Sequence, residues 1–64
     1  MSWSDCMEKK IDHEWGPTAA KECAHSFSKG NLEGMAECII KYAEVSDPEV
    51  VLGRLTEWSL GCAI

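Results

Sequence analysis

The chain has 64 residues, of which 45% are hydrophobic and 27% charged, with a formal net charge of −5. This composition is typical of a globular protein and excludes a disordered chain, and no apolar run approaches the roughly 18–20 residues of a membrane-spanning helix. The acidic charge repels phosphate backbones and anionic lipids, so we expect neither nucleic acid nor a membrane as a partner. We expect one small domain, residues 1–64, whose core is marginal because so short a chain hides only about 60% of its unfolded surface.

The first predicted helix begins after Ser2 or Ser4, since either serine can cap an N-terminus. Its apolar residues recur at every fourth position, with Cys6 beside them: Trp3, Met7, Ile11 and Trp15. Gly16-Pro17 ends this helix, and Pro17 also suits the first turn of a second one.

The second predicted helix runs from Pro17 to a glycine cap at Lys29-Gly30. Its inner face consists of Ala20, Cys23, Ala24 and Phe27. Asn31 is a favourable cap for a third helix. The buried stripe of that helix consists of Leu32, Met35, Ala36, Ile39 and either Tyr42 or Ala43. Ile40 lies off this stripe, so the third helix is expected to contact something on a second side.

A fourth helix restarts at residues 46–49, where Ser46 and Glu49 fit a capping box and Asp47-Pro48 fits a cap followed by a first-turn proline. Its inward residues are Val51, Leu52, Leu55 and Trp58. No segment shows the alternation of a strand. The prediction is an all-α fold, a compact bundle of three to four short helices with a central antiparallel helical hairpin formed by the second and third.

The four cysteines admit two interpretations. Cys23 and Cys38 each lie about seven residues from the Gly30–Asn31 turn, or roughly 10 Å along a helix, so they would face each other in a hairpin. Cys6 and Cys62 would then pair near the chain ends, although four cysteines allow three pairings. The N-terminal residues lack the pattern of a signal peptide, so we expect a cytoplasmic protein with four free, buried thiols.

A metal or catalytic role finds little support. The available ligands would be Cys6, His13, Cys23 and His25. Cys23 and His25 are two positions apart on a helix and point to different sides. Cys6 and His13 could share one face of a helix, but the sequence indicates no further ligands that would meet them at one zinc centre. A chain this small does not easily build a deep pocket. We therefore expect no metal, no cofactor and no enzymatic activity.

A helix-turn-helix would use residues 19–28 and a recognition helix at residues 32–44. The start of that recognition helix carries Glu33 and Glu37 and no lysine or arginine before Lys41. Acids at these positions repel the DNA phosphates that normally supply much of the affinity.

The remaining prediction is binding to a protein. Residues 31–64 carry six acids against Lys41 and Arg54, which suits a partner with a basic patch, or a second copy in a homodimer with apolar anchors. The candidate interface residues are Trp3, Trp58, Ile40, Val50, Glu37 and Glu44. We expect a small acidic intracellular interaction module, a regulator, adaptor or inhibitor subunit. The alternatives are a helix-turn-helix-like DNA-binding regulator and a disulfide-stapled secreted helical peptide.

Overall fold

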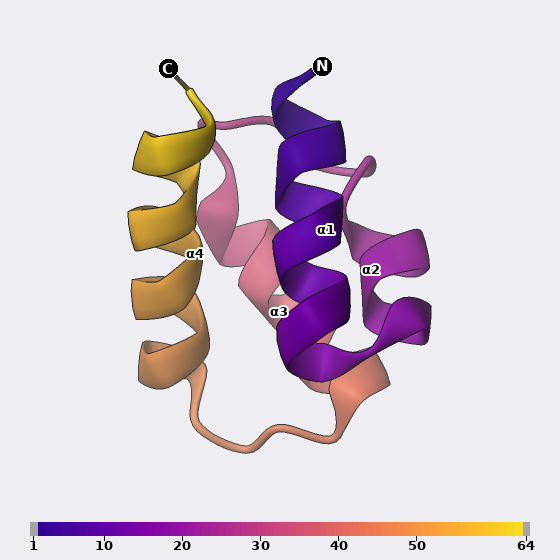
Figure 1. The fold of residues 1–64 in the computed structure, drawn as a ribbon. Helices are drawn as coiled ribbons and strands as arrows, with labels where there is room; N and C mark the ends of the chain where they lie inside the picture. The colour runs from indigo at the N-terminus through magenta and orange to yellow at the C-terminus, as the bar shows by residue number, and fades with distance from the viewer. Residues whose placement is uncertain (1, 64) are drawn as a thin grey trace.

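The computed structural model describes residues 2–63, and in that range the chain is entirely helical apart from turns. The helices are α1 (Trp3–Trp15), α2 (Pro17–Cys23), α3 (Leu32–Ala43) and α4 (Pro48–Cys62). They alternate in direction, so that both chain ends lie at the same end of the bundle (Figure 1). Each helix packs against its neighbours in the chain, and α4 returns to pack against α1. The predicted all-α bundle with an antiparallel α2–α3 hairpin is confirmed.

Local hydrogen bonds fix where three of these helices begin. The Ser2 hydroxyl accepts a bond from the Asp5 amide, so Ser2 rather than Ser4 caps α1. The Asn31 side chain accepts from the Gly34 amide at 3.0 Å and caps α3. Asp47 caps α4 by accepting from the amides of Glu49 and Val50, so the capping box at Ser46 does not form. Short polar side chains at these positions satisfy amides that lack a partner within the helix.

The junction between α1 and α2 depends on Gly16, whose φ is +97°. Only glycine adopts such a conformation at low cost. The proline that follows starts α2 at a position where an amide N–H would have no partner within the helix, so the missing N–H of proline costs no hydrogen bond. At the other end of α3, Glu44 takes a left-handed conformation with φ of 56° and stops the helix.

Helix α2 is shorter than the sequence predicted, because it ends at Cys23 and not at Lys29. The Ser26 hydroxyl donates to the Glu22 carbonyl at 3.0 Å. In a continuing helix that carbonyl would accept a hydrogen bond from the Ser26 amide. The Ser26 amide instead lies 3.5 Å from the Cys23 carbonyl, in a tighter turn. A serine hydroxyl that bonds to the carbonyl four residues earlier competes with the backbone, and it slightly destabilises and often bends a helix. Phe27 nevertheless packs against the core from the loop.

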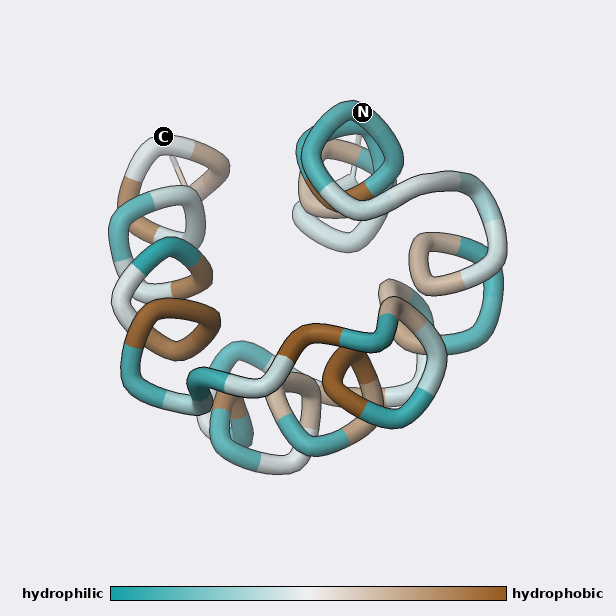
Figure 2. The backbone as a smooth tube through the Cα atoms, turned by 90° about the horizontal axis from the view of Figure 1, so that it is seen from below, coloured by the Kyte–Doolittle hydropathy of each residue, from teal (hydrophilic) through white to brown (hydrophobic). Residues whose placement is uncertain are grey.

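Buried residues of all four helices form one cluster in the interior that the helices surround (Figure 2). Its members are Met7, Ile11, Ala19, Ala20, Cys23, Ala24, Met35, Ala36, Ile39, Val51 and Leu55. None of these is aromatic. Trp3, Trp15 and Trp58 lie half-buried at its margin, and Tyr42, one of two candidates for the end of the α3 stripe, is 40% exposed while Ala43 is half-buried. The core is therefore small and built largely from short side chains.

Two glycines in helices allow a matched test of this packing. A methyl group added at Gly53 meets nothing within 4 Å, whereas one added at Gly34 lies 2.7 Å from Asn31 Nδ2 and 2.9 Å from Phe27 Cε1. Because alanine favours a helix interior, Gly53→Ala is expected to raise the free energy of unfolding by about 0.5–1 kcal/mol. Gly34→Ala should lower it by about 1 kcal/mol, since it displaces the Asn31 cap. Urea unfolding followed by circular dichroism measures both, and equal stabilisation by the two variants would contradict the close packing at Gly34.

Candidate functional site

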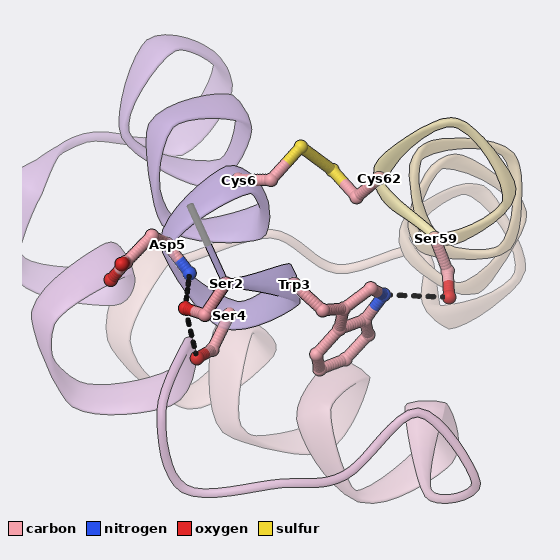
Figure 3. Close-up of a disulfide and its surroundings, with 7 residues drawn as sticks. All are labelled: Ser2, Trp3, Ser4, Asp5, Cys6, Ser59 and Cys62. Carbon is pink, nitrogen blue, oxygen red and sulfur yellow. Dashed lines mark hydrogen bonds between the residues drawn. A yellow bond between two sulfur atoms is a disulfide. The ribbon is translucent and has the colours of Figure 1, made fainter. Parts of the chain in front are cut away.

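The first covalent link joins α1 to α4. Cys6 and Cys62 are 56 positions apart in sequence, and their Cα atoms lie 5.7 Å apart across a disulfide. Figure 3 shows a second link beside it, in which the Trp3 indole N–H donates to the Ser59 hydroxyl at 3.1 Å. Together these bonds hold the N-terminal end of α1 against the C-terminal end of α4.

The second link joins α2 to α3. Cys23, at the end of α2 and fully buried, forms a disulfide with half-buried Cys38 in the middle of α3, with the Cα atoms 5.8 Å apart. This pair lies within the loop closed by Cys6–Cys62, so the two bridges are nested. The symmetry of Cys23 and Cys38 about the turn, noted from the sequence, is the signal that pointed to this pairing.

None of the four cysteines is a free thiol, so the expectation of buried free thiols is wrong. The cytoplasmic localisation inferred with it is also wrong, because structural disulfides form and persist in oxidising, extracellular settings. The prediction that the chain is an intracellular regulator, adaptor or inhibitor is wrong for the same reason. That inference depended on the usual redox state of the cytoplasm and gave too little weight to the chain's size, since small domains with marginal cores commonly carry disulfides.

The residues considered for zinc do not assemble. Cys6 and Cys23 are bound to other sulfurs, and His13 and His25 lie in different surroundings. His25 Nε2 is 3.0 Å from Glu8 Oε1 and 3.6 Å from Asp5 Oδ1. These three side chains are well exposed and pair with one another across α1 and the turn after α2, which accounts for their proximity.

The helix-turn-helix alternative does not match the geometry either. That motif joins two helices at a steep angle through a turn of three or four residues. Here α2 and α3 are antiparallel, cross-linked by Cys23–Cys38 and connected by the longer segment 24–31.

Two of the predicted interface residues meet in a groove between α3 and α4. The groove is lined by Glu33, Ala36, Glu37, Ile40, Pro48 and Leu52. Ile40 and Leu52 are half-buried within it, while Glu33 and Glu37 are exposed at its edge. Its volume is about 120 Å³. The off-stripe position of Ile40 is the sequence signal for this surface. Leu52, which the sequence predicts to face inward, packs against the core and also lines the groove.

The other predicted interface residues lie elsewhere. The Trp3 indole N–H donates to the Ser59 hydroxyl, and the centroids of the Trp58 and Trp15 rings lie 5.1 Å apart, so Trp3 and Trp58 both make internal contacts. Val50 is 47% exposed in the first turn of α4, outside the groove. Glu44 ends α3. Sequence reasoning missed the most exposed large apolar side chain, Leu60 at 70%, because it lies beyond the last residue of the predicted stripe.

None of the described helices combines the length and apolar character that crossing a bilayer requires. Comparisons of the chain with protein-family models, with curated proteins and with solved structures give no match.

Removing each disulfide separately tests its structural contribution. In the loop-closure model the long Cys6–Cys62 loop contributes about 4 kcal/mol to the free energy of unfolding and the short Cys23–Cys38 loop about 3 kcal/mol. We expect Cys6→Ala with Cys62→Ala, and Cys23→Ala with Cys38→Ala, to lower stability by these amounts. Urea unfolding of the oxidised variants at 25 °C provides the measurement. A loss below about 1 kcal/mol from either double variant would show that its bridge does not constrain the chain.

Proposed function

We propose that this chain is a secreted, disulfide-stapled helical peptide that acts outside the cell by binding another protein. The observation that carries this proposal is the pair of nested disulfides, which tie α1 to α4 and α2 to α3. Such links supplement a small core where the environment is oxidising. They also hold the exposed faces of the helices in fixed positions before a partner arrives, which lowers the entropy cost of binding.

The groove between α3 and α4 is the surface that best fits this role. Ile40 and Leu52 form an apolar floor, and Glu33 and Glu37 border it. A volume of about 120 Å³ is below the roughly 300 Å³ of small-molecule sites, so the groove suits one apolar side chain of a partner. The two glutamates favour a partner whose apolar anchor is flanked by lysine or arginine.

Binding, and not catalysis, is the activity proposed. The four cysteines are oxidised, so none supplies a thiolate nucleophile. His13 and His25 lie on separate surfaces, and the carboxylates near His25 are as exposed as the imidazole itself. Exposed groups of this kind are poorly placed to exclude water from a reaction.

The disulfide pairing is the first point to test. Cleavage after lysine and arginine places each cysteine in a different peptide, within residues 1–9, 22–29, 30–41 and 55–64. Protein purified without reductant, unfolded in urea and digested with trypsin should yield peptide 1–9 linked to 55–64 and peptide 22–29 linked to 30–41, as determined by mass spectrometry. Reduction should then reduce the helical ellipticity at 222 nm by more than half at 37 °C, because small domains often fail to fold without their bridges.

The same experiment with iodoacetamide-blocked, reduced protein is the control. A link between peptides 1–9 and 22–29, or a reduced chain as helical as the oxidised one, would remove the basis for a stapled extracellular peptide.

The groove is tested with a defined cationic partner. A fluorescent synthetic helix of leucine and lysine should bind the oxidised protein, and Glu33→Gln with Glu37→Gln should weaken that binding about tenfold, because each charge contact contributes up to about 1 kcal/mol. Fluorescence anisotropy measures the dissociation constants. Asp12→Asn with Glu57→Gln removes the same charge outside the groove, at exposed positions of α1 and α4. Equal weakening by both double variants would show attraction to net charge alone.

A further inference from the structure

A second hollow lies on the opposite side of α4, between α4 and α1. It is lined by Lys9, Lys10, His13, Glu14, Arg54 and Trp58. We call it the α1–α4 cleft. Its volume of about 310 Å³ is at the lower end of the range for small-molecule sites. It shares no lining residue with the groove between α3 and α4.

Cationic side chains converge on this cleft although the protein is acidic. Three of the six lysines and arginines of the chain line it, together with His13, in a molecule of net charge −5. Glu14 is the one acid in the lining. No ion pair joins Lys10 or His13 to another residue in the part of the chain that the structure describes. Lys10 therefore contributes a positive charge to the cleft that no ion pair among the described residues offsets, and His13 adds imidazole nitrogens that can donate to an anion.

Arg54 contacts Glu14 through one nitrogen of its guanidinium, which leaves other N–H donors without that contact. Its Nη1 lies 3.5 Å from Glu14 Oε2, which is longer than a good hydrogen bond. A guanidinium carries five N–H donors in a fork that matches the oxygens of a carboxylate, sulfate or phosphate. The contact with Glu14 orients the guanidinium and leaves most of these donors for a ligand.

Trp58 gives the cleft an apolar wall. Trp58 is half-buried, and the centroid of its ring lies 5.1 Å from that of the Trp15 ring at an interplanar angle of 56°. Such a tilted aromatic pair is a favourable arrangement that restricts the orientation of both rings. The part of Trp58 that borders the cleft is a surface on which a flat ring can pack.

The two helices that form the cleft are covalently linked at one end and joined by an ion pair toward the other. The Cys6–Cys62 disulfide and the Trp3–Ser59 hydrogen bond join them at one end (Figure 3), and the Arg54–Glu14 pair joins them toward the other. A cleft held open in this way does not need to be assembled by its ligand.

We infer that the α1–α4 cleft binds a small organic oxyanion carried on a planar ring, with Lys10, His13 and Arg54 on the anionic group and Trp58 against the ring. The occupant is a free small molecule, because the cleft is a hollow of limited volume and not an extended cationic track. This inference is independent of the groove between α3 and α4.

Naphthalene-2-sulfonate is a suitable probe because it combines a flat ring with a permanent negative charge. Titration of the oxidised, nitrogen-15-labelled protein should shift the amide signals of Lys10, His13 and Arg54 and the indole signal of Trp58. Lys10→Gln with Arg54→Gln should raise the dissociation constant at least tenfold. The matched control, Lys21→Gln with Lys29→Gln, removes the same charge at exposed positions outside the cleft and should change it less than twofold.

Two further ligands separate the contributions of charge and ring. Uncharged naphthalene-2-methanol and inorganic sulfate should each bind at least tenfold more weakly than naphthalene-2-sulfonate at the same ionic strength. Equal affinity for the uncharged analogue would overturn the role of the cations, and equal affinity for sulfate would overturn the role of Trp58. Equal weakening by the control variant, or shifts confined to residues outside the cleft, would overturn the site. Unchanged signals from the core residues Met35 and Ile39 verify that each variant is folded.

Discussion

The nested disulfides are the constraint on which the rest of this structure depends. The fully buried residues are mostly short side chains, four of them alanines, and no aromatic ring is fully enclosed. Such a core buries limited apolar area, and a chain of 64 residues has little more to contribute. The two bridges compensate by restricting the unfolded chain. They connect the four helices in two pairs, α1 with α4 and α2 with α3, and the packing of the core joins the pairs.

Because the bridges lie at the margins and within the hairpin, the exposed faces of the helices are left for other contacts. Charge is distributed unevenly over these faces. Glutamates border the groove between α3 and α4, whereas half of the lysines and arginines gather at the cleft between α1 and α4. The acidic net charge of the whole chain conceals this division, and it is the local sign that decides which ligand each surface attracts.

Helix positions could be predicted from the sequence wherever a local interaction determines them. Asn31, Pro17 and Asp47 act within one turn of themselves, and the structure places them at helix starts as expected. The early end of α2 could not be predicted, because it depends on whether the Ser26 hydroxyl or the Ser26 amide bonds to the Glu22 carbonyl, and the apolar pattern does not distinguish the two. The spacing of the cysteines predicted that Cys23 lies opposite Cys38. The spacing could not predict that the cysteines are oxidised, because their redox state depends on the environment of the protein.

The four residues of α4 that the sequence predicts to face inward do not share one environment, and the two surfaces explain why. Val51 and Leu55 point to the core, Pro48 and Leu52 line the groove beside α3, and Arg54 and Trp58 line the cleft beside α1. Each pair is spaced by four residues, so each follows its own line along the helix. A helix with three such lines has no single apolar face, and sequence periodicity cannot assign its residues to one side. Both surfaces also lie on the part of α4 that precedes Cys62, where the helix is held to its neighbours by packing, a hydrogen bond and an ion pair. The two surfaces therefore lie on opposite sides of the same helix, along the segment that precedes its disulfide at Cys62.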